Sequence, residues 1–126
     1  MPDCSLIYAD LATNVTDAVL ASGAPYLPAN TYLNVNFPAA GAGTECTKAA
    51  DFKFVLSRIF FATILSGKDV DTCGNGGRLP TETSVEGTEG CYVSVSVGHA
   101  NDKLDADADE QAVVLKKLGG ILSCLP

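Results

Sequence analysis

Two kinds of hydrophobic pattern follow one another near the start of the chain. In residues 6–21 the apolar side chains recur every four positions, at Ile7, Leu11, Val15 and Val19. This spacing predicts an amphipathic helix, and Gly23 is placed to end it. Apolar and polar residues then alternate in Tyr32-Leu33-Asn34-Val35-Asn36-Phe37, which predicts a strand with two unlike faces. A helix, a short link and a strand in this order indicate an α/β fold.

Two further segments have the alternation of strands. In residues 52–59, Phe52, Phe54 and Leu56 share one face, and in residues 92–97 three valines alternate with hydroxyl-bearing residues. The apolar run at 60–65 has no clear period, and we interpret it as a strand or the extension of one. The sequence therefore predicts a sheet that includes residues 32–37, 52–59 and 92–97.

A second helix is predicted at 107–124. Asp107 and Glu110 form an Asp-x-x-Glu variant of the capping box, and an apolar stripe follows them. Gly119-Gly120 would cost this helix about 1 kcal/mol each relative to alanine. A close packing contact would explain the two glycines, and a helix that ends at Lys117 is the alternative.

Composition limits the class of protein. The 126 residues are enough for one domain, and 47% of them are hydrophobic while 18% are charged. The net charge of −7 argues against nucleic acid and anionic membrane surfaces as partners. The longest apolar run, residues 59–65, is much shorter than the roughly 20 residues of a membrane span. Residues 1–4 lack the basic and apolar regions of a signal peptide, so we expect either a cytoplasmic chain or a mature or truncated form.

The five cysteines favour the second of these expectations. Cys4, Cys46, Cys73, Cys91 and Cys124 are widely spread and contain no Cys-x-x-Cys pair for zinc or redox chemistry. We predict two disulfides and one spare thiol, in a chain secreted into an oxidising compartment. The sequence does not give their connectivity. Asn14-Val15-Thr16 is an N-glycosylation sequon on the polar side of the first helix, which agrees with secretion.

Three motifs could carry chemistry, and each has a simpler explanation. His99 is the only histidine and no Gly-x-Ser-x-Gly occurs, so we expect a loop or surface histidine rather than a catalytic one. The acidic run 105–110 lacks the glycine and distal glutamate of a calcium loop and is explained by the helix start. Gly74-Asn75-Gly76-Gly77-Arg78 is no Walker motif and predicts a disulfide-bounded turn, with Arg78 a weak anion-contact candidate. We therefore assign no catalytic residue, metal ligand or cofactor to this chain.

Several stretches together resemble the C-terminal portion of the SurE-like phosphatase and nucleotidase family. They are the helix from Tyr8, the run Leu33-Asn34-Val35-Asn36-Phe37-Pro38, and the run Gly90-Cys91-Tyr92-Val93-Ser94-Val95-Ser96. Residues 51–58, 79–83 and 122–126 look similar to the secreted fungal branch, the acid phosphatases. Two departures are the insertion of Cys91 before the tyrosine and the replacement of a Pro-Leu pair by Gly98-His99.

The resemblance implies a metal-dependent phosphomonoesterase with a Rossmann-like three-layer sheet. In that family two adjacent aspartates after the first strand, with a serine and an asparagine from later loops, hold a divalent metal. Those motifs lie upstream of the segment present here, and the chain contains no Asp-Asp dipeptide. We therefore expect a partial domain that is inactive alone: the C-terminal part of the fold, a mixed sheet with two main helices and long disulfide-tied loops.

The resemblance also divides the single partial domain, residues 1–126, into three regions. Residues 6–38 supply the helix and strand, 39–90 would be an extended arm used for subunit pairing, and 91–126 supply a strand and the last helix. The arm and the open edges of a shortened sheet predict a homo-oligomer. Two alternatives stay open: an independent small secreted antigen or binding protein built on the same half, and an enzyme with a rebuilt site around His99.

The disulfide pairing can be stated as a prediction within this picture. Cys73–Cys91 would close the glycine-rich excursion, and Cys46–Cys124 would be the second bridge. Cys4 lies outside the resembling segment and would stay free.

Overall fold

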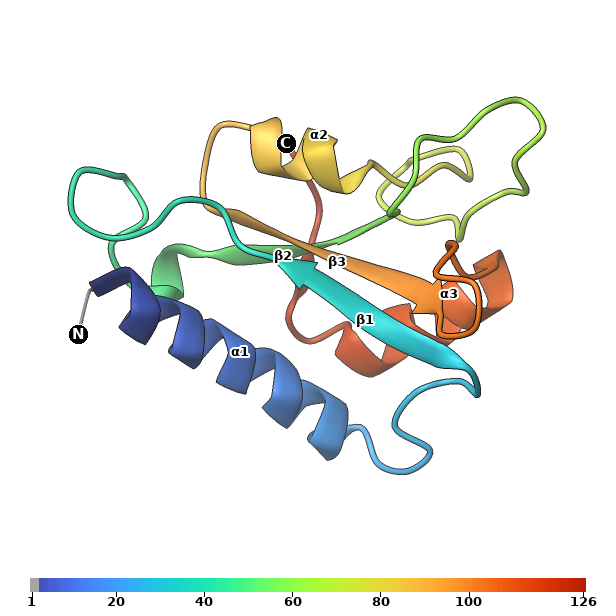
Figure 1. Cartoon of the computed structure of the whole chain (residues 1–126), viewed down its shortest axis with the longest axis horizontal. Coiled ribbons are helices and arrows are strands. Elements are labelled where there is room, and N and C mark those ends of the chain that lie inside the picture. The colour runs from blue at the N-terminus through green and yellow to red at the C-terminus, as the bar shows by residue number, and fades with distance from the viewer. Residues whose placement is uncertain (1–2) are drawn as a thin grey trace.

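A mixed β-sheet of four strands, covered by helices, is the framework of the chain in a computed structural model that describes residues 3–126 (Figure 1). The predicted α/β class is confirmed. The elements in chain order are α1 (Asp3–Ala21), β1 (Thr31–Asn36), the short 3₁₀ turn η1 (Ala49–Asp51), β2 (Lys53–Ser57), α2 (Glu82–Gly87), β3 (Tyr92–His99), α3 (Ala108–Leu118) and β4 (Leu122–Ser123).

The strands lie in the order β1-β3-β2-β4. β1 is antiparallel to β3, with Val35 opposite Val95, whereas β2 is parallel to both β3 and β4. β3 and β2 are the two inner strands, and each is buried along most of its length because it has a neighbour on both sides. β1 has a strand partner on one side only.

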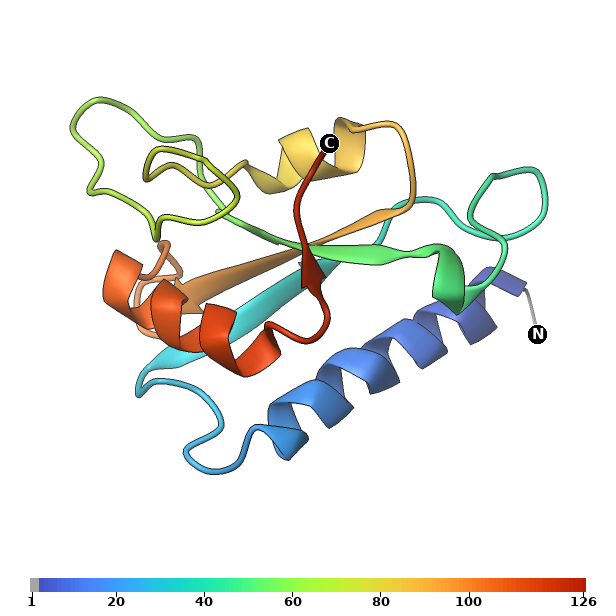
Figure 2. The same ribbon diagram turned by 180° about the vertical axis from the view of Figure 1, so that it is seen from behind.

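The apolar face of the sheet packs on α1 and α3, and α2 covers part of the other face (Figures 1 and 2). Leu11 of α1, Val95 of β3 and Val114 of α3 are fully buried in one continuous cluster. Burying an aliphatic side chain of this size contributes about 1.5–3 kcal/mol. The cluster therefore fixes both long helices against the sheet.

The N-terminal helix agrees with the sequence pattern, although it begins at Asp3 rather than at residue 6. The ring of Tyr8 stacks on that of Phe37, with 5.2 Å between the ring centroids. The Tyr8 hydroxyl also donates a hydrogen bond of 2.8 Å to the carbonyl oxygen of Pro38. These contacts join the start of the helix to the chain that leaves β1.

The predicted C-terminal helix is correct at its start and wrong at its end. The Asp107 side chain accepts a bond of 2.9 Å from the Glu110 amide, and the Glu110 carboxylate accepts one of 3.1 Å from the Asp107 amide. This is the predicted capping box. The helix ends at Leu118, close to the alternative that placed its end at Lys117. Gly119 and Gly120 therefore lie after the helix, and residues 122–123 form a strand.

The interpretation of residues 60–65 as a strand was wrong. β2 ends at Ser57, and the amides of Ile59 and Phe60 donate to the Asp105 carboxylate at 2.6 and 3.0 Å instead of to a neighbouring strand. The segment that follows is a loop that extends from the body of the molecule (Figure 1). The short helix α2 was not predicted, because its six residues do not show a helical period.

The predicted disulfide pairing was also wrong, although the same four cysteines form the bridges. Cys46 is bonded to Cys91 and Cys73 to Cys124, while Cys4 is free as expected. The parallel strands explain this pairing. Cys46 and Cys91 each precede one of the parallel strands β2 and β3, which start at the same end of the sheet. β4 runs parallel to β2, so Cys124 directly after β4 lies at the same end of the sheet as the carboxyl end of β2. The loop that carries Cys73 follows β2 and starts from that same end.

The two disulfides indicate an extracellular or otherwise oxidising environment for the folded chain. Within residues 3–126, no helix combines the length and apolar character that crossing a membrane requires.

Candidate functional site

A buried group of charged side chains lies where β2 leaves the sheet. Arg58 is 7% exposed, and one of its terminal nitrogens contacts both carboxylate oxygens of Asp69 at 2.7 and 2.9 Å. The other terminal nitrogen lies 3.5 Å from Asp105. The Nε atom of Arg58 donates to the Phe60 carbonyl oxygen at 2.6 Å. The guanidinium is therefore held by two carboxylates and one carbonyl.

Asp69 is the centre of this group. Besides Arg58, its carboxylate accepts hydrogen bonds from the Leu79 amide at 2.9 Å, the Gln111 side chain at 3.2 Å and Arg78 at 3.3 Å. Burial by itself would raise the pKa of Asp69, but these donors and the Arg58 charge lower it below its ordinary value. Asp69 is therefore an ionised, fully bonded carboxylate that links three parts of the chain.

A cleft of 210 Å³ lies beside these residues, and His99 lines it. The other charged groups of the lining are Arg58, Lys68, Asp69, Asp105 and Asp107. His99 ends β3, and Asp107 caps α3, so the cleft lies between the end of that strand and the start of that helix. His99 is the one histidine of the sequence, so it is the residue of this cleft to be considered first for acid–base chemistry.

His99 is paired with Glu110, with 2.6 Å between Nε2 and Oε1. This hydrogen bond raises the pKa of His99, and the nearby carboxylates of Asp102 and Asp107 add to the effect. The same Glu110 oxygen also accepts the Asp107 amide, which closes the capping box. The arrangement stabilises a protonated histidine at the helix start, and no serine or cysteine of residues 3–126 lines the cleft beside it.

The buried carboxylates do not fit a divalent metal. Both Asp69 and Asp105 use their oxygens on Arg58 and on backbone amides, so a metal ion would have to displace a guanidinium. No group of three or more His, Cys, Asp and Glu side chains suited to a metal ion occurs in the part of the chain that the structure describes. We therefore derive no metal-dependent step from these residues.

A second polar cluster lies under α2, on the other face of the sheet. Ser57 and Ser96 share a hydrogen bond of 2.6 Å, and Asn34 donates to Glu82 at 2.6 Å. The Ser94 hydroxyl and the Oε1 atom of Glu86 are buried, and between residues 3 and 126 neither has a hydrogen-bond partner of normal geometry. Burial raises the pKa of the Glu86 carboxyl, Glu82 reinforces the rise, and the adjoining Ser94 groups offset only part of it. The alternating hydroxyls of β3 therefore face a close-packed helix rather than solvent.

The glycine-rich segment is a turn that satisfies its own polar groups. The Asn75 side chain accepts from the amides of Thr72 and Gly77 at 3.3 and 2.8 Å and donates to the Val70 carbonyl at 3.0 Å. Gly77 has a φ of 84°, a conformation that favours glycine. The Cys73–Cys124 disulfide holds the turn against the C-terminal segment. Because the Gly77 amide is occupied by Asn75, this part of the turn does not offer a phosphate cradle.

The other predicted site residues lie apart from these clusters. Asn14 is exposed on α1, as a glycan acceptor requires, and glycosylation there stays a prediction. Arg78 is half-buried beside Asp69 and donates to the Gly67 carbonyl at 2.9 Å. The structure thus brings both Arg78 and His99 near the buried network, Arg78 through its contact with Asp69 and His99 through the cleft that Arg58, Asp69 and Asp105 also line.

The sequence analysis missed the residues that carry this network. Arg58, Asp69, Asp105 and Gln111 are separated by as many as 53 positions, and no motif joins them. The one available signal is an arginine placed directly after a buried strand, since a buried guanidinium requires carboxylate partners. That signal predicts partners without identifying them.

Comparisons of the chain with protein-family models, with curated proteins and with solved structures find no match. The function is therefore argued from the geometry and from the motifs of the sequence.

Proposed function

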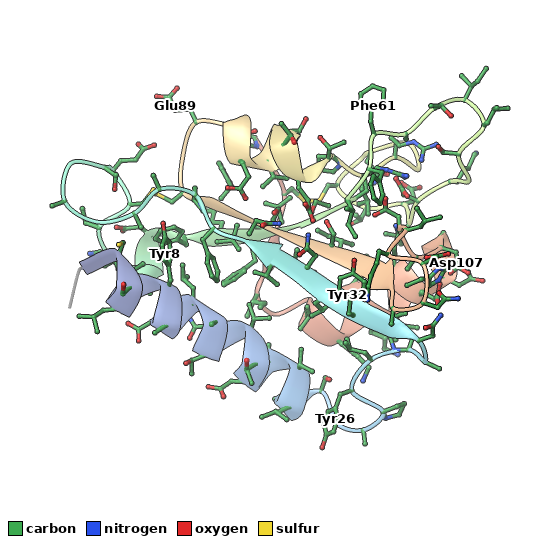
Figure 3. All side chains as sticks on the ribbon, viewed as in Figure 1. Tyr8, Tyr26, Tyr32, Phe61, Glu89 and Asp107 are labelled. Carbon is green, nitrogen blue, oxygen red and sulfur yellow. A yellow bond between two sulfur atoms is a disulfide. The ribbon has the colours of Figure 1, made fainter. Side chains whose placement is uncertain are left out.

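We propose that this chain is the C-terminal part of a SurE-like, secreted phosphomonoesterase, and that its own role is to pair with a second copy rather than to hydrolyse phosphate esters. The observation that carries the pairing role is the loop between β2 and Asp69. Four large apolar side chains are exposed in it: Phe60 at 47%, Phe61 at 85%, Ile64 at 100% and Leu65 at 91%. Phe61 points away from the sheet (Figure 3).

A cluster of this kind favours an interaction surface. Single exposed apolar residues are common, but several together in one loop mark a site of contact with another molecule. Residues 60–65 lie within the region that the SurE resemblance assigns to a subunit-pairing arm. The occupant that this resemblance supports is therefore a second copy of the chain.

The base of the loop is held firmly, which favours a role in recognition over an unstructured connection. Arg58 at one end is bonded to Asp69 at the other, and both are buried. Asp105 binds the first amides of the loop and also lies beside Arg58. The apolar tip is thus presented from a fixed base, and this reduces the conformational entropy lost on association.

The expectation that the chain is inactive alone has support of a different kind. The metal-binding motifs of the SurE-like family lie upstream of the segment that this chain resembles. The buried carboxylates here are occupied by Arg58, and His99 is engaged with Glu110. Phosphoryl transfer in that family depends on the metal, so these residues do not replace it.

One observation favours the alternative of an independent secreted binding protein. The chain forms a continuous core of its own, in which Leu11, Val93 and Val114 are fully buried, and two disulfides close its long loops. The upstream reading frame separates the two hypotheses. A strand there that ends in Asp-Asp supports the phosphatase fragment, and its absence supports the independent protein.

The pairing role is tested by sedimentation velocity over a range of concentrations. We expect a concentration-dependent dimer that the triple variant Phe61→Ser/Ile64→Ser/Leu65→Ser abolishes. The control is Leu6→Ser/Leu20→Ser, which removes two apolar side chains of α1 that are 54% and 56% exposed. A wild-type chain that stays monomeric, or a dimer that both variants weaken equally, contradicts the proposal.

Catalysis is tested with p-nitrophenyl phosphate in the presence of Mg²⁺ or Mn²⁺. We expect no hydrolysis above that of a buffer control. Metal-dependent hydrolysis would contradict the inactive-fragment hypothesis, and its loss in His99→Ala would support the rebuilt site instead.

A further inference from the structure

A cavity of 520 Å³ lies between β2, α3 and the C-terminal segment. Four parts of the chain line it: β2 with Val55 and Leu56, the turn at residues 72–80, the end of α3, and residues 122–126 (Figure 2). Its volume falls in the range of about 300–1,000 Å³ that is typical of small-molecule sites. Neither the ionic network nor the pairing role requires it.

The lining has a definite chemical character. Most of its side chains are apolar, and Arg78 is the only charged residue among them. Five leucines from separate parts of the chain contribute to the apolar lining: Leu56, Leu79, Leu115, Leu122 and Leu125. No Asp or Glu side chain of residues 3–126 lines this cavity, although the chain as a whole carries a net charge of −7. The site therefore differs from the surface around it in both polarity and sign of charge.

Arg78 retains the capacity to bind an anion. Its contact with Asp69 is the longer of the two arginine contacts to that carboxylate, 3.3 Å against 2.7 Å for Arg58. Its other bonds go to the carbonyl oxygens of Gly67 and Ser66, and within residues 3–126 its Nε donates no hydrogen bond. The side chain is 36% exposed, whereas that of Arg58 is 8% exposed. A carboxylate or sulfonate can therefore approach Arg78 without breaking the buried pair.

The walls of the cavity are fixed before any ligand arrives. The Cys73–Cys124 disulfide joins the turn to the C-terminal segment, and both cysteines line the cavity. Asn75 holds the turn through three hydrogen bonds, and Leu122 is paired with Phe54 in the sheet. A preformed site binds more tightly because little conformational entropy is lost on binding.

We propose that this cavity binds a small amphipathic anion, with its apolar body among the leucines and its acidic group at Arg78. An uncharged molecule of the same shape would bind more weakly, because it would gain no charge-assisted bond. The proposal is independent of the SurE resemblance and of self-association.

The test is an NMR titration of the full chain with decanoate and with decanol, which share an unbranched alkyl chain and differ in charge. We expect saturable binding of decanoate with shifts confined to the cavity lining, and weaker binding of decanol. Arg78→Gln should weaken decanoate about tenfold and leave decanol nearly unchanged, since a charged hydrogen bond at a partly exposed site is being removed. Arg78→Lys should restore part of the decanoate affinity.

A second pair of variants locates the apolar part of the site. Leu115→Trp adds a bulky side chain at the cavity wall and should abolish binding of both probes. Val113→Trp makes a similar change on an exposed position of the same helix, where the side chain is 44% exposed, and should leave binding intact. Retained native amide shifts establish that each variant is folded.

Three results in the binding data would overturn the proposal, and a fourth concerns where the probe binds. The first three are the absence of saturable decanoate binding, equal affinities for decanoate and decanol in the wild-type chain, and loss of binding in Val113→Trp to the same degree as in Leu115→Trp. Shifts centred on residues 60–65 would show that the probe binds the exposed loop, which also contradicts a site in the cavity.

Discussion

Replacing Asp69 by asparagine tests whether the buried ionic network holds the loop onto the body of the protein. The side chain of Asp69 is 3% exposed and accepts hydrogen bonds from Arg58, Arg78, Gln111 and the Leu79 amide. Asparagine has nearly the same shape but carries no charge. It also presents an NH₂ group to neighbours that are themselves donors. The substitution therefore leaves the Arg58 guanidinium with Asp105 as its remaining carboxylate partner.

The expected loss follows from the burial of this pair. Removing one partner of a buried ion pair costs about 3–5 kcal/mol, because the other charge stays buried and poorly compensated. Asp105 lies 3.5 Å from Arg58 and compensates part of this charge, so we expect the lower end of that range. A domain of this size has a total unfolding free energy of about 5–15 kcal/mol. Asp69→Asn should therefore remove a large fraction of the stability.

The measurement is urea unfolding followed by circular dichroism with both disulfides intact. With a urea slope of about 2 kcal/mol per M, a loss of about 3 kcal/mol lowers the midpoint by about 1.5 M. The matched control is Asp71→Asn, which makes the same change at an exposed position two residues away. That variant should unfold within about 0.5 kcal/mol of the wild type.

The pH dependence gives a second signature of the same carboxylate. Because the pKa of Asp69 is lowered in the fold, its contribution is present above the unfolded value of 3.8. It is lost as the pH falls below that value and through the folded pKa. Asp69→Asn should flatten this part of the stability profile. If Asp69→Asn is as stable as Asp71→Asn, the network does not hold the loop and the reasoning fails.

Three further predictions concern other groups. Burial raises the pKa of Glu86 above 4.5, so the contribution of its protonated form to stability is lost as the pH rises through the folded pKa. Glu86→Gln should therefore raise the melting temperature at pH 7, and a melting temperature below that of the wild type contradicts this. Glu110 raises the pKa of His99 above 6.5, so the contribution of this pair to stability is present below pH 6.5 and lost as the pH rises through the folded pKa. NMR titration should show a lower His99 pKa in Glu110→Gln than in the wild type, and an unchanged pKa refutes the pairing. Mass mapping of non-reduced peptides should find the Cys73–Cys124 bridge, and a different cysteine pairing refutes that topology. Cys73→Ala/Cys124→Ala should lower the unfolding free energy by about 4 kcal/mol, because the bridge closes a long loop.

The local sequence determined the type of the elements that have a clear period of their own. The four-residue spacing in α1 and the alternation in β1 and β3 are local properties, and each predicted an element of the right type. The capping box at Asp107 was likewise predictable, because the two residues that form it lie three positions apart. The exposed position of Asn14 and the free thiol of Cys4 agree with what the sequence predicted.

The tertiary structure decided everything that depends on which segments become neighbours. The disulfides join cysteines that the parallel strands bring to common ends of the sheet, and loop length alone favoured the wrong pairs. Residues 60–65 have the composition of a strand, yet Asp105 takes the amides at the start of the loop and leaves the apolar side chains exposed.

The same distinction applies to the candidate sites. Arg58 and Asp69 can be ionised and buried only because the fold brings them together, and no periodic signal relates positions eleven residues apart in a loop. The cavity beside Arg78 is formed by segments that meet through β4 and the Cys73–Cys124 bridge. The hydrophobic period of a segment predicts which face of one helix or strand is buried. These sites depend instead on contacts between elements far apart in the chain.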